Sequence, residues 1–191
     1  MSTQQDRVDE ALKSCRRIDD DTVKTFIAFC KHYGHDLGYI VQGKPVLDIG
    51  CGKNGGLCDF VLEQGATSYT GVDIDAIAVN FSRCVEPRGT FIWDDPIHIL
   101  STLKEPHVVV SAAIFDPCIL PDDAYNKKLI EAIVRQTPVG WHTAHWGGDL
   151  YEFVRYFTNA GFIETSESLC INTGYKGREL FGVYEKVKTN E

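Results

Sequence analysis

A short segment near residue 50 combines glycines with an acidic residue in a pattern that is typical of cofactor-binding loops. Gly50, Gly52 and Gly55 have the spacing G-x-G-x-x-G, and Asp48 stands two residues before Gly50. Glycine lets the backbone turn sharply and lets a ligand approach it closely. The pattern lies between an expected strand and an expected helix, which is where such loops bind their ligands.

Asp48 separates two classes of ligand for this loop. A dinucleotide places its pyrophosphate at the N-terminus of the following helix, and a carboxylate just before the glycines would repel those phosphates. A cofactor with a cationic amino-acid end would tolerate or use the same carboxylate. A nicotinamide-dependent oxidoreductase therefore stays an alternative, and Asp48 disfavours it.

More acidic residues follow at the ends of the next two expected strands. Asp73 ends the second strand and lies 21 residues after Gly52. An aspartate at a strand end often only caps the following helix, and we expect that role for Asp75. For Asp94, at the end of the third strand, the sequence leaves ligand binding and capping equally open, because Asp95 can serve in either role.

These residues resemble the cofactor motifs of the Rossmann-like S-adenosylmethionine-dependent methyltransferases. The resemblance runs from Gly43 to Lys188 and is carried by Asp48-Ile-Gly-Cys-Gly52, Tyr69-Thr-Gly-Val-Asp-Ile-Asp75 and Trp93-Asp94-Asp95. In that family, the acid that ends the second strand accepts hydrogen bonds from both ribose hydroxyls, and Asp73 matches it. An acid after the third strand binds the adenine amine, and Asp94 matches it. The resemblance implies S-adenosyl-L-methionine as the cofactor, held by Asp48, Gly50, Cys51 (through its backbone), Gly52, Asp73, Ile74, Asp94 and Ser111.

The acceptor side shows no fixed catalytic motif. Methyl transfer from a sulfonium is an in-line displacement that orientation and desolvation promote, and a general base helps only when the acceptor must lose a proton. The candidate catalytic residues are Asp116, which follows the fourth expected strand, and His145, at the carboxyl end of the fifth. A turn before Pro117 and a structural histidine remain open as alternatives. His142 and His145 point to opposite faces of a strand, so we predict no metal site.

The sequence favours a small-molecule acceptor that is methylated on an oxygen or nitrogen atom. The segment from Ser111 to Pro117 lacks the Asn/Asp-Pro-Pro-Tyr/Phe motif of enzymes that methylate amide or nucleobase amino groups. The net charge is −8, with 27 acidic and 19 basic residues, which weighs against a nucleic-acid substrate. A protein methyltransferase and a non-enzymatic partner subunit stay open as alternatives.

Strand and helix patterns alternate around these residues. The expected strands are Pro45–Gly50, Ser68–Asp73, Thr90–Trp93, His107–Ala113, Gly140–His145, Phe162–Ile171 and Glu179–Val187. The loop between the last two is too short for a parallel crossover, so they must be antiparallel. We therefore predict a three-layer α/β/α sandwich with a mostly parallel, seven-stranded sheet and a C-terminal antiparallel strand. Ligands of such sheets bind at the carboxyl ends of the strands.

The length of 191 residues favours one domain, with residues 1–42 as an N-terminal helical lid and 43–191 as a Rossmann-like core. The apolar run from Val108 to Phe115 is too short to span a bilayer, and Met1 to Asp9 lacks the apolar region of a signal peptide. Seven widely spaced cysteines without a CxxC pair indicate reduced thiols. We expect a cytoplasmic monomer or homodimer that binds neither nucleic acid nor membrane.

Overall fold

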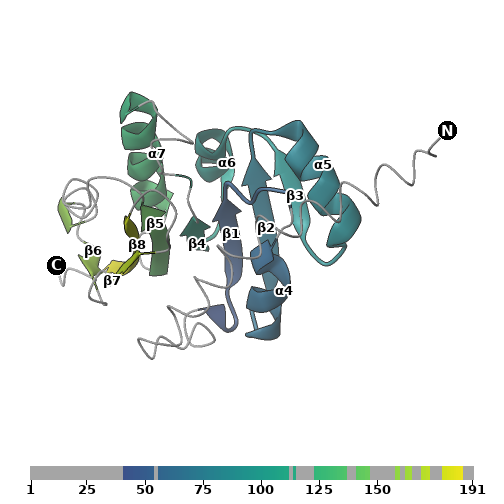
Figure 1. The fold of residues 1–191 in the computed structure, drawn as a ribbon, viewed down its shortest axis with the longest axis horizontal. Coiled ribbons are helices and arrows are strands. Elements are labelled where there is room, and N and C mark those ends of the chain that lie inside the picture. The colour runs from purple at the N-terminus through teal and green to yellow at the C-terminus, as the bar shows by residue number, and fades with distance from the viewer. Residues whose placement is uncertain are drawn as a thin grey trace.

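The computed structural model describes residues 41–53, 56–111, 114, 123–136, 141–146, 158–159, 162–164, 169–172 and 178–186. Strands and helices alternate along most of this part of the chain (Figure 1). The elements are β1 (Pro45–Ile49), α4 (Gly56–Glu63), β2 (Ser68–Asp73), α5 (Ala76–Val85), β3 (Thr90–Trp93), α6 (Pro96–Thr102), β4 (Val108–Ser111), α7 (Asp123–Gln136), β5 (Trp141–Trp146), β6 (Phe162–Glu164), β7 (Leu169–Asn172) and β8 (Arg178–Lys186). Residues 1–40 of the expected N-terminal lid lie outside the described residues. No helix within the described ranges has the length and apolar character needed to cross a membrane.

One sheet contains every described strand, in the order β3-β2-β1-β4-β5-β8-β6, with β7 also paired to β8. Strands β1 to β5 are parallel to one another. The next strand in the sheet, β8, is antiparallel to β5. The chain moves outward from β1 through β2 to β3, and then returns to place β4 on the other side of β1. This reversal makes the carboxyl ends of β1 and β4 the ligand-binding position of an open parallel sheet. The α/β fold with a parallel sheet is as predicted.

The described part of the sheet has eight strands, whereas the sequence predicts seven. The difference lies in the run Phe162–Ile171, which forms β6 and β7 rather than one strand. Glu164 is opposite Tyr184 and Leu169 is opposite Phe181. Between these two pairs, β8 contributes only residues 182 and 183, whereas four residues of the sequence separate Glu164 from Leu169. A ladder with unequal numbers of residues on its two sides cannot continue without interruption.

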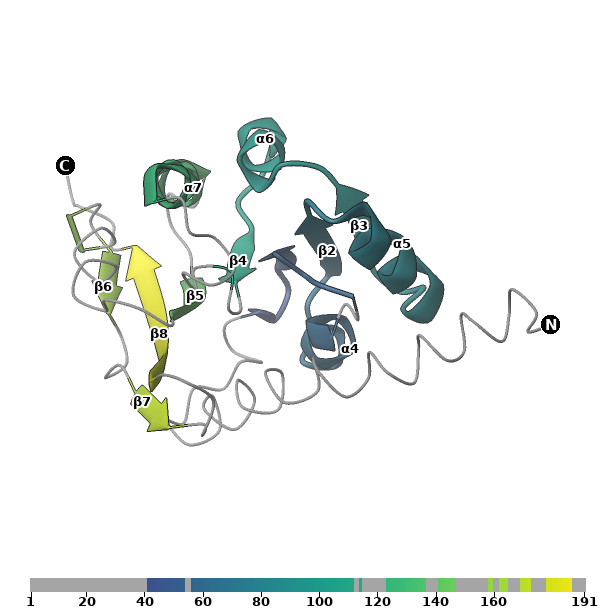
Figure 2. The same ribbon diagram turned by 45° about the horizontal axis from the view of Figure 1, so that its top comes forward.

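The helices cover both faces of the parallel strands. Figure 2 shows α6 and α7 on one side of the sheet and α4 on the other. One buried cluster joins β1 and β2 to α4 and α5, and it includes Val46, Leu57, Val61, Tyr69 and Val79. The other joins β1 and β4 to α6 and α7, and it includes Leu47, Ile49, Leu100, Leu129 and Ile133. Alternation along β1 thus directs Asp48, like Val46, to the α4 face.

Aspartates begin the two helices that follow β2 and β3. The Asp75 carboxylate accepts a hydrogen bond of 2.8 Å from the Ile77 N–H and is the N-cap of α5, as predicted. Asp95 is the N-cap of α6, and Pro96 occupies the first turn of that helix. Both are favoured residues at these positions. Because Asp95 is the cap, the preceding residue, Asp94, is not needed for that role.

Candidate cofactor site

The glycine loop bends back over the end of β2. The φ angles of Gly50 and Gly52 are 73° and 63°, in the left-handed region that residues with a Cβ rarely adopt. The backbone N–H groups of Gly50 and Cys51 both donate to the Val72 carbonyl oxygen, at 2.8 and 3.2 Å. A Cβ on Gly50 would also lie 3.1 Å from the Ile114 Cδ1 atom. The loop therefore needs glycine at position 50 for its conformation and for space.

Asp73 connects the second strand to this loop. One oxygen of its carboxylate accepts a hydrogen bond of 3.0 Å from the Gly52 N–H, and the other accepts one of 2.9 Å from the Asp75 N–H. A carboxylate has about four acceptor positions, so two backbone donors leave capacity for further donors. The side chain is half-buried. Asp73 is thus held in place beside the loop and can still accept hydrogen bonds from a ligand.

Asp48 lies beneath the loop and is almost fully buried, with 3% of its surface exposed. Its carboxylate accepts a hydrogen bond of 2.6 Å from the Tyr69 hydroxyl, which is itself buried. Burial raises the pKa of Asp48 to about 7, the Tyr69 hydrogen bond opposes that rise, and the Asp73 charge adds to it. Asp48 therefore changes its charge near neutral pH, and it repels phosphate only in its ionised form.

Cys51 packs inward from the loop rather than facing a ligand. A Cβ placed on Gly71 would lie 2.8 Å from the Cys51 Sγ atom, so the absence of a side chain at Gly71 makes room for this thiol. Burial raises the pKa of Cys51 far above its usual range, and the group stays a thiol. The carbonyl oxygen of Gly52 accepts a hydrogen bond of 2.9 Å from the Ser82 hydroxyl, which ties the loop to α5.

Asp94 lies next to Asp73 at the carboxyl ends of β2 and β3. Its backbone N–H donates to the Asp73 carbonyl oxygen at 3.2 Å. One carboxylate oxygen accepts from the Asp95 N–H at 2.7 Å, and the other lies 2.9 Å from the His98 Nδ1 atom. The hydrogen bond with His98 and then that from the Asp95 N–H lower the pKa of Asp94. The carboxylate therefore stays ionised at neutral pH.

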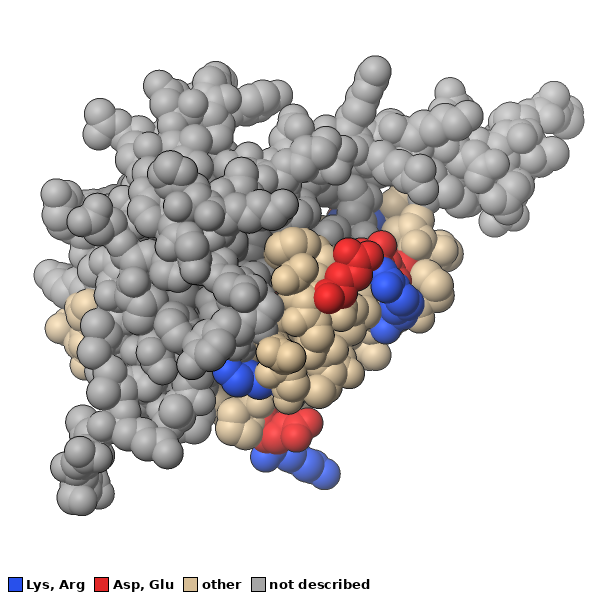
Figure 3. Space-filling view, turned by 90° about the horizontal axis from the view of Figure 1, so that it is seen from below, with Lys and Arg blue, Asp and Glu red and all other residues tan. Residues whose placement is uncertain are grey.

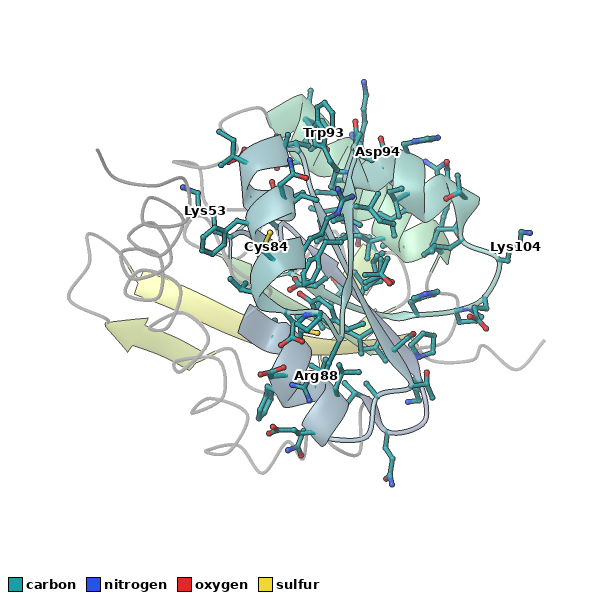
Figure 4. The ribbon with its side chains drawn as sticks, turned by 90° about the vertical axis from the view of Figure 1, so that its right-hand side faces the viewer. Lys53, Cys84, Arg88, Trp93, Asp94 and Lys104 are labelled. Carbon is teal, nitrogen blue, oxygen red and sulfur yellow. The ribbon has the colours of Figure 1, made fainter. Side chains whose placement is uncertain are left out.

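Two large apolar side chains are exposed beside these acids. Ile74 is 61% exposed and Trp93 is 63% exposed, and the Trp93 indole N–H donates to the Ile74 carbonyl oxygen at 3.0 Å. Figure 4 shows Trp93 and Asp94 at the same end of the molecule, whereas Arg88 lies toward the other end. Exposed apolar groups of this size are typical of a surface that contacts a ring.

The remaining site residues from the sequence fall at the same edge of the sheet where they are described. Ser111 is fully buried at the end of β4 and pairs with Ile49 of β1. His145 lies near the end of β5, one residue beyond the partner of Ser111. Asp116 and Gly55 lie outside the described residues. Within the described ranges, no three His, Cys, Asp or Glu residues form a group that could hold a metal ion.

Several solved structures have a similar fold that covers most of this chain. The magnesium protoporphyrin IX methyltransferase of Synechocystis PCC 6803, with bound S-adenosylmethionine, has a TM-score of 0.67 at 16% identity, over 92% of this chain and 83% of its own. A TehB-like S-adenosylmethionine-dependent methyltransferase from Corynebacterium glutamicum has a TM-score of 0.59 at 16% identity, over 86% of this chain and 98% of its own. An rRNA methylase from Streptococcus thermophilus has a TM-score of 0.57 at 12% identity, over 80% of this chain and 93% of its own.

This chain has the fold of the S-adenosylmethionine-dependent methyltransferases. No protein-family model matches its sequence, and no curated protein matches it. At such low identity the likeness establishes the methyltransferase fold, and the ligands have to be argued from the site itself.

The sequence patterns did not predict three side-chain contacts at this site. Tyr69 contacts Asp48, Ser82 contacts the loop carbonyl, and His98 contacts Asp94. His98 is four residues after Asp94 at the start of an expected helix, and that spacing is a usable signal. Tyr69 and Ser82 meet their partners only through the parallel pairing of β1 with β2 and the packing of α5. No local pattern identifies such contacts.

Proposed function

We propose that this protein transfers a methyl group from S-adenosylmethionine to an acceptor. The observation that carries the proposal is Asp73, which ends β2, is anchored to the Gly52 N–H at 3.0 Å and retains acceptor capacity on both carboxylate oxygens. Such a group fits a pair of neighbouring ribose hydroxyls. Asp48 and Asp73 together also make the loop unfavourable for a pyrophosphate, which disfavours a nicotinamide cofactor.

Each part of the site has a distinct role in this proposal. The backbone of Gly50, Cys51 and Gly52 lets the amino-acid end of the cofactor approach closely. Asp73 accepts from the ribose, and the ionised Asp94 accepts from the adenine amine. Ile74 and Trp93 supply apolar contact for the ring. The bound cofactor brings an activated methyl group, so the protein contributes mainly orientation and exclusion of water.

For the acceptor we propose a small molecule that is methylated on oxygen or nitrogen. The net charge of −8 disfavours a nucleic-acid phosphate backbone. On the described part of the surface in Figure 3, acidic and basic side chains lie close together in small groups instead of forming a broad basic area. Among proteins of this fold, the Synechocystis enzyme is named for a porphyrin, but another is named for rRNA, so the acceptor class must be tested directly.

His145 and Asp116 are the residues we propose for the acceptor side, as a general base or as hydrogen-bonding groups. His145 lies near the carboxyl end of β5, at the same edge of the sheet as Ser111, and this position supports the proposal. We also propose that the chain is a single domain in which residues 1–42 form an N-terminal lid. The proposed location is the reducing cytoplasm.

The first experiment is a calorimetric titration of the purified protein with S-adenosylhomocysteine, the demethylated form of the cofactor. We expect saturable binding in the micromolar range. Binding of reduced nicotinamide dinucleotide, without binding of S-adenosylhomocysteine, would show that the proposed cofactor is wrong.

A second experiment identifies the acceptor class. The protein and methyl-labelled S-adenosylmethionine are incubated in three separate reactions with material from the same cells. One reaction contains a metabolite extract, one contains RNA and one contains extract protein. Label in the small-molecule fraction supports the proposal, and label in RNA or protein would replace it by the corresponding alternative. Cofactor binding with no transfer to any fraction would favour a non-enzymatic partner subunit.

A further inference from the structure

Asp48 forms a buried pair with Tyr69, and the proposed function gives the Tyr69 hydroxyl no role. The two side chains are joined by a hydrogen bond of 2.6 Å. Asp48 is 3% exposed and Tyr69 is 1% exposed. A buried carboxylate with so few donors costs stability as an anion. Its position, two residues before Gly50 and directly beneath the loop, suggests what offsets that cost.

Four described titratable groups interact with Asp48, and only Tyr69 favours its ionisation. Tyr69 and Asp73 come from β2, Cys51 from the loop and Cys58 from α4. The Asp73 charge raises the pKa of Asp48, and the Asp48 charge in turn raises the pKa of both thiols. The Tyr69 hydroxyl is the group that favours the carboxylate anion. No cationic side chain of the described residues contributes to the charge balance of Asp48.

Asp48 lies opposite Gly71 on the paired strand, two residues before Asp73, and the Asp73 charge raises the pKa of Asp48. Charge at the end of β2 therefore acts on the buried carboxylate. Asp73 is the residue that faces the cofactor in the proposed function. Electrostatic coupling of this kind is reciprocal. A cation bound beside Asp73 must therefore favour the ionised form of Asp48, and an ionised Asp48 must favour a bound cation.

We propose that Tyr69 is a positioning residue of the cofactor site: its hydroxyl holds Asp48 as the anion that makes the site prefer a cationic cofactor over a neutral one. The inference rests on the proposed function, since it concerns the same site. S-adenosylmethionine carries a sulfonium charge that S-adenosylhomocysteine lacks. Asp48 would thus help the protein to release its product and to bind its substrate.

The pH dependence follows from the sign of the pKa shift. The raised pKa of about 7 means that the empty site holds Asp48 largely protonated at pH 6 and largely ionised at pH 8. The preference for S-adenosylmethionine, measured as the ratio of the two dissociation constants, should therefore increase with pH. A group that titrates at pH 7 changes its ionised fraction roughly tenfold across this range, which sets the upper limit of the increase.

The experiment measures both dissociation constants by calorimetry at pH 6, 7 and 8 for the full-length protein and three variants. Asp48→Asn supplies the baseline, because the cofactor's amino group also titrates in this range. Tyr69→Phe removes only the hydroxyl, so the pH at which the preference appears should move upward. Tyr125→Phe is the matched control, because it removes a hydrogen bond of 2.9 Å from a tyrosine to Asp95, a helix cap outside the cofactor site.

The expected result is a preference that increases several-fold with pH in the wild type and in Tyr125→Phe, and much less in Asp48→Asn. In Tyr69→Phe the same increase should appear at higher pH. If Asp48→Asn does not fold, the comparison of Tyr69→Phe with Tyr125→Phe still decides. Wild-type and Tyr69→Phe proteins with the same pH course would overturn the role of Tyr69. A wild type that binds neither ligand at any pH would overturn the proposed function itself.

Discussion

Three aspartates at or near the candidate cofactor site have different roles because of what each side chain contacts. Asp73 accepts backbone hydrogen bonds from Gly52 and Asp75, whereas Asp75 caps α5. Asp48 is buried against a tyrosine hydroxyl. Identical side chains on β1, at the end of β2 and at the start of α5 thus carry a variable charge, hold a loop and begin a helix.

Replacing Asp73 by alanine should weaken the binding of S-adenosylhomocysteine. The change removes the acceptors for the ribose and the anchor of the Gly52 N–H, and we expect a loss of about 1–3 kcal/mol in binding free energy. Calorimetry of the folded variant measures it. Asp75→Ala is the matched control: losing the cap should lower the free energy of unfolding by about 0.5–2 kcal/mol and leave the affinity nearly unchanged. Equal affinities of wild type and Asp73→Ala would remove Asp73 from the site.

His98 should sharpen the recognition of adenine through Asp94. The two side chains lie 2.9 Å apart, so His98→Ala frees the carboxylate to turn away from the ring. We expect affinity for S-adenosylhomocysteine to fall roughly two- to fivefold, as for an exposed ion pair, and His98→Gln to retain most of it. S-inosylhomocysteine, which lacks the exocyclic amine, serves as the comparison ligand. An equal loss for both ligands would show that His98 acts on the helix rather than on adenine recognition.

At the scale of elements, the pairing of β1 with β2 builds the floor of the site. The register places Val46 opposite Tyr69 and Asp48 opposite Gly71. Side chains at these positions share the α4 face, where the thiol of Cys51 fills the space above Gly71. The glycine loop, the buried acid and the core of this face are therefore packed as one unit.

Gly71→Ala should destabilise this unit. The new Cβ would lie 2.8 Å from the Cys51 Sγ atom and 2.9 Å from the Phe91 Cδ1 atom, distances that force the neighbours to move. Overpacking of this kind costs about 1–3 kcal/mol, measurable as the free energy of unfolding in urea. In a Cys51→Ala background the cost should be only partly reduced, because the Sγ contact is removed whereas the Cβ at position 51, 2.9 Å from the new Cβ, remains. A Gly71→Ala variant as stable as the wild type would show that the packing under the loop is loose.

At the scale of the whole molecule, one edge of the sheet brings together the candidate cofactor residues at the ends of β1, β2, β3 and β4. The reversal of strand order at β1 and β4 brings segments far apart in the sequence to the same place. The two buried clusters on opposite faces pack against these strands. Ligand binding at this edge should therefore stabilise the whole described fold.

Cofactor binding should therefore raise the thermal stability of the protein. Ligand at about 100 times its dissociation constant stabilises the folded state by roughly 2.7 kcal/mol. For a chain of this size that corresponds to an increase in Tm of about 5–11 °C. Differential scanning fluorimetry with S-adenosylhomocysteine measures it, and reduced nicotinamide dinucleotide at the same concentration should leave Tm unchanged. A shift with the dinucleotide alone would reverse the choice of cofactor.

Local chemistry in the sequence determined the elements and much of the candidate site. Strands β2 and β3 have the predicted limits, because each is a short run of residues suited to a strand, with an acidic residue as its last residue or directly after it. Asp75 is recognisable as a cap because a cap contacts its own helix. The glycine spacing and Asp73 are likewise readable, since a strand, a loop and a helix follow one another directly.

Tertiary structure decided what depends on distant partners. The charge of Asp48 follows from its burial and from Tyr69 on the neighbouring strand, and no pattern around Asp48 contains that information. Which of Asp94 and Asp95 caps α6, and which remains available for a ligand, depended on where α6 begins. The run that forms β6 and β7 was split by its register against β8. Hydrogen-bond partners and desolvation depend on residues that only the fold brings together. Periodicity and capping depend on residues that are close in the sequence.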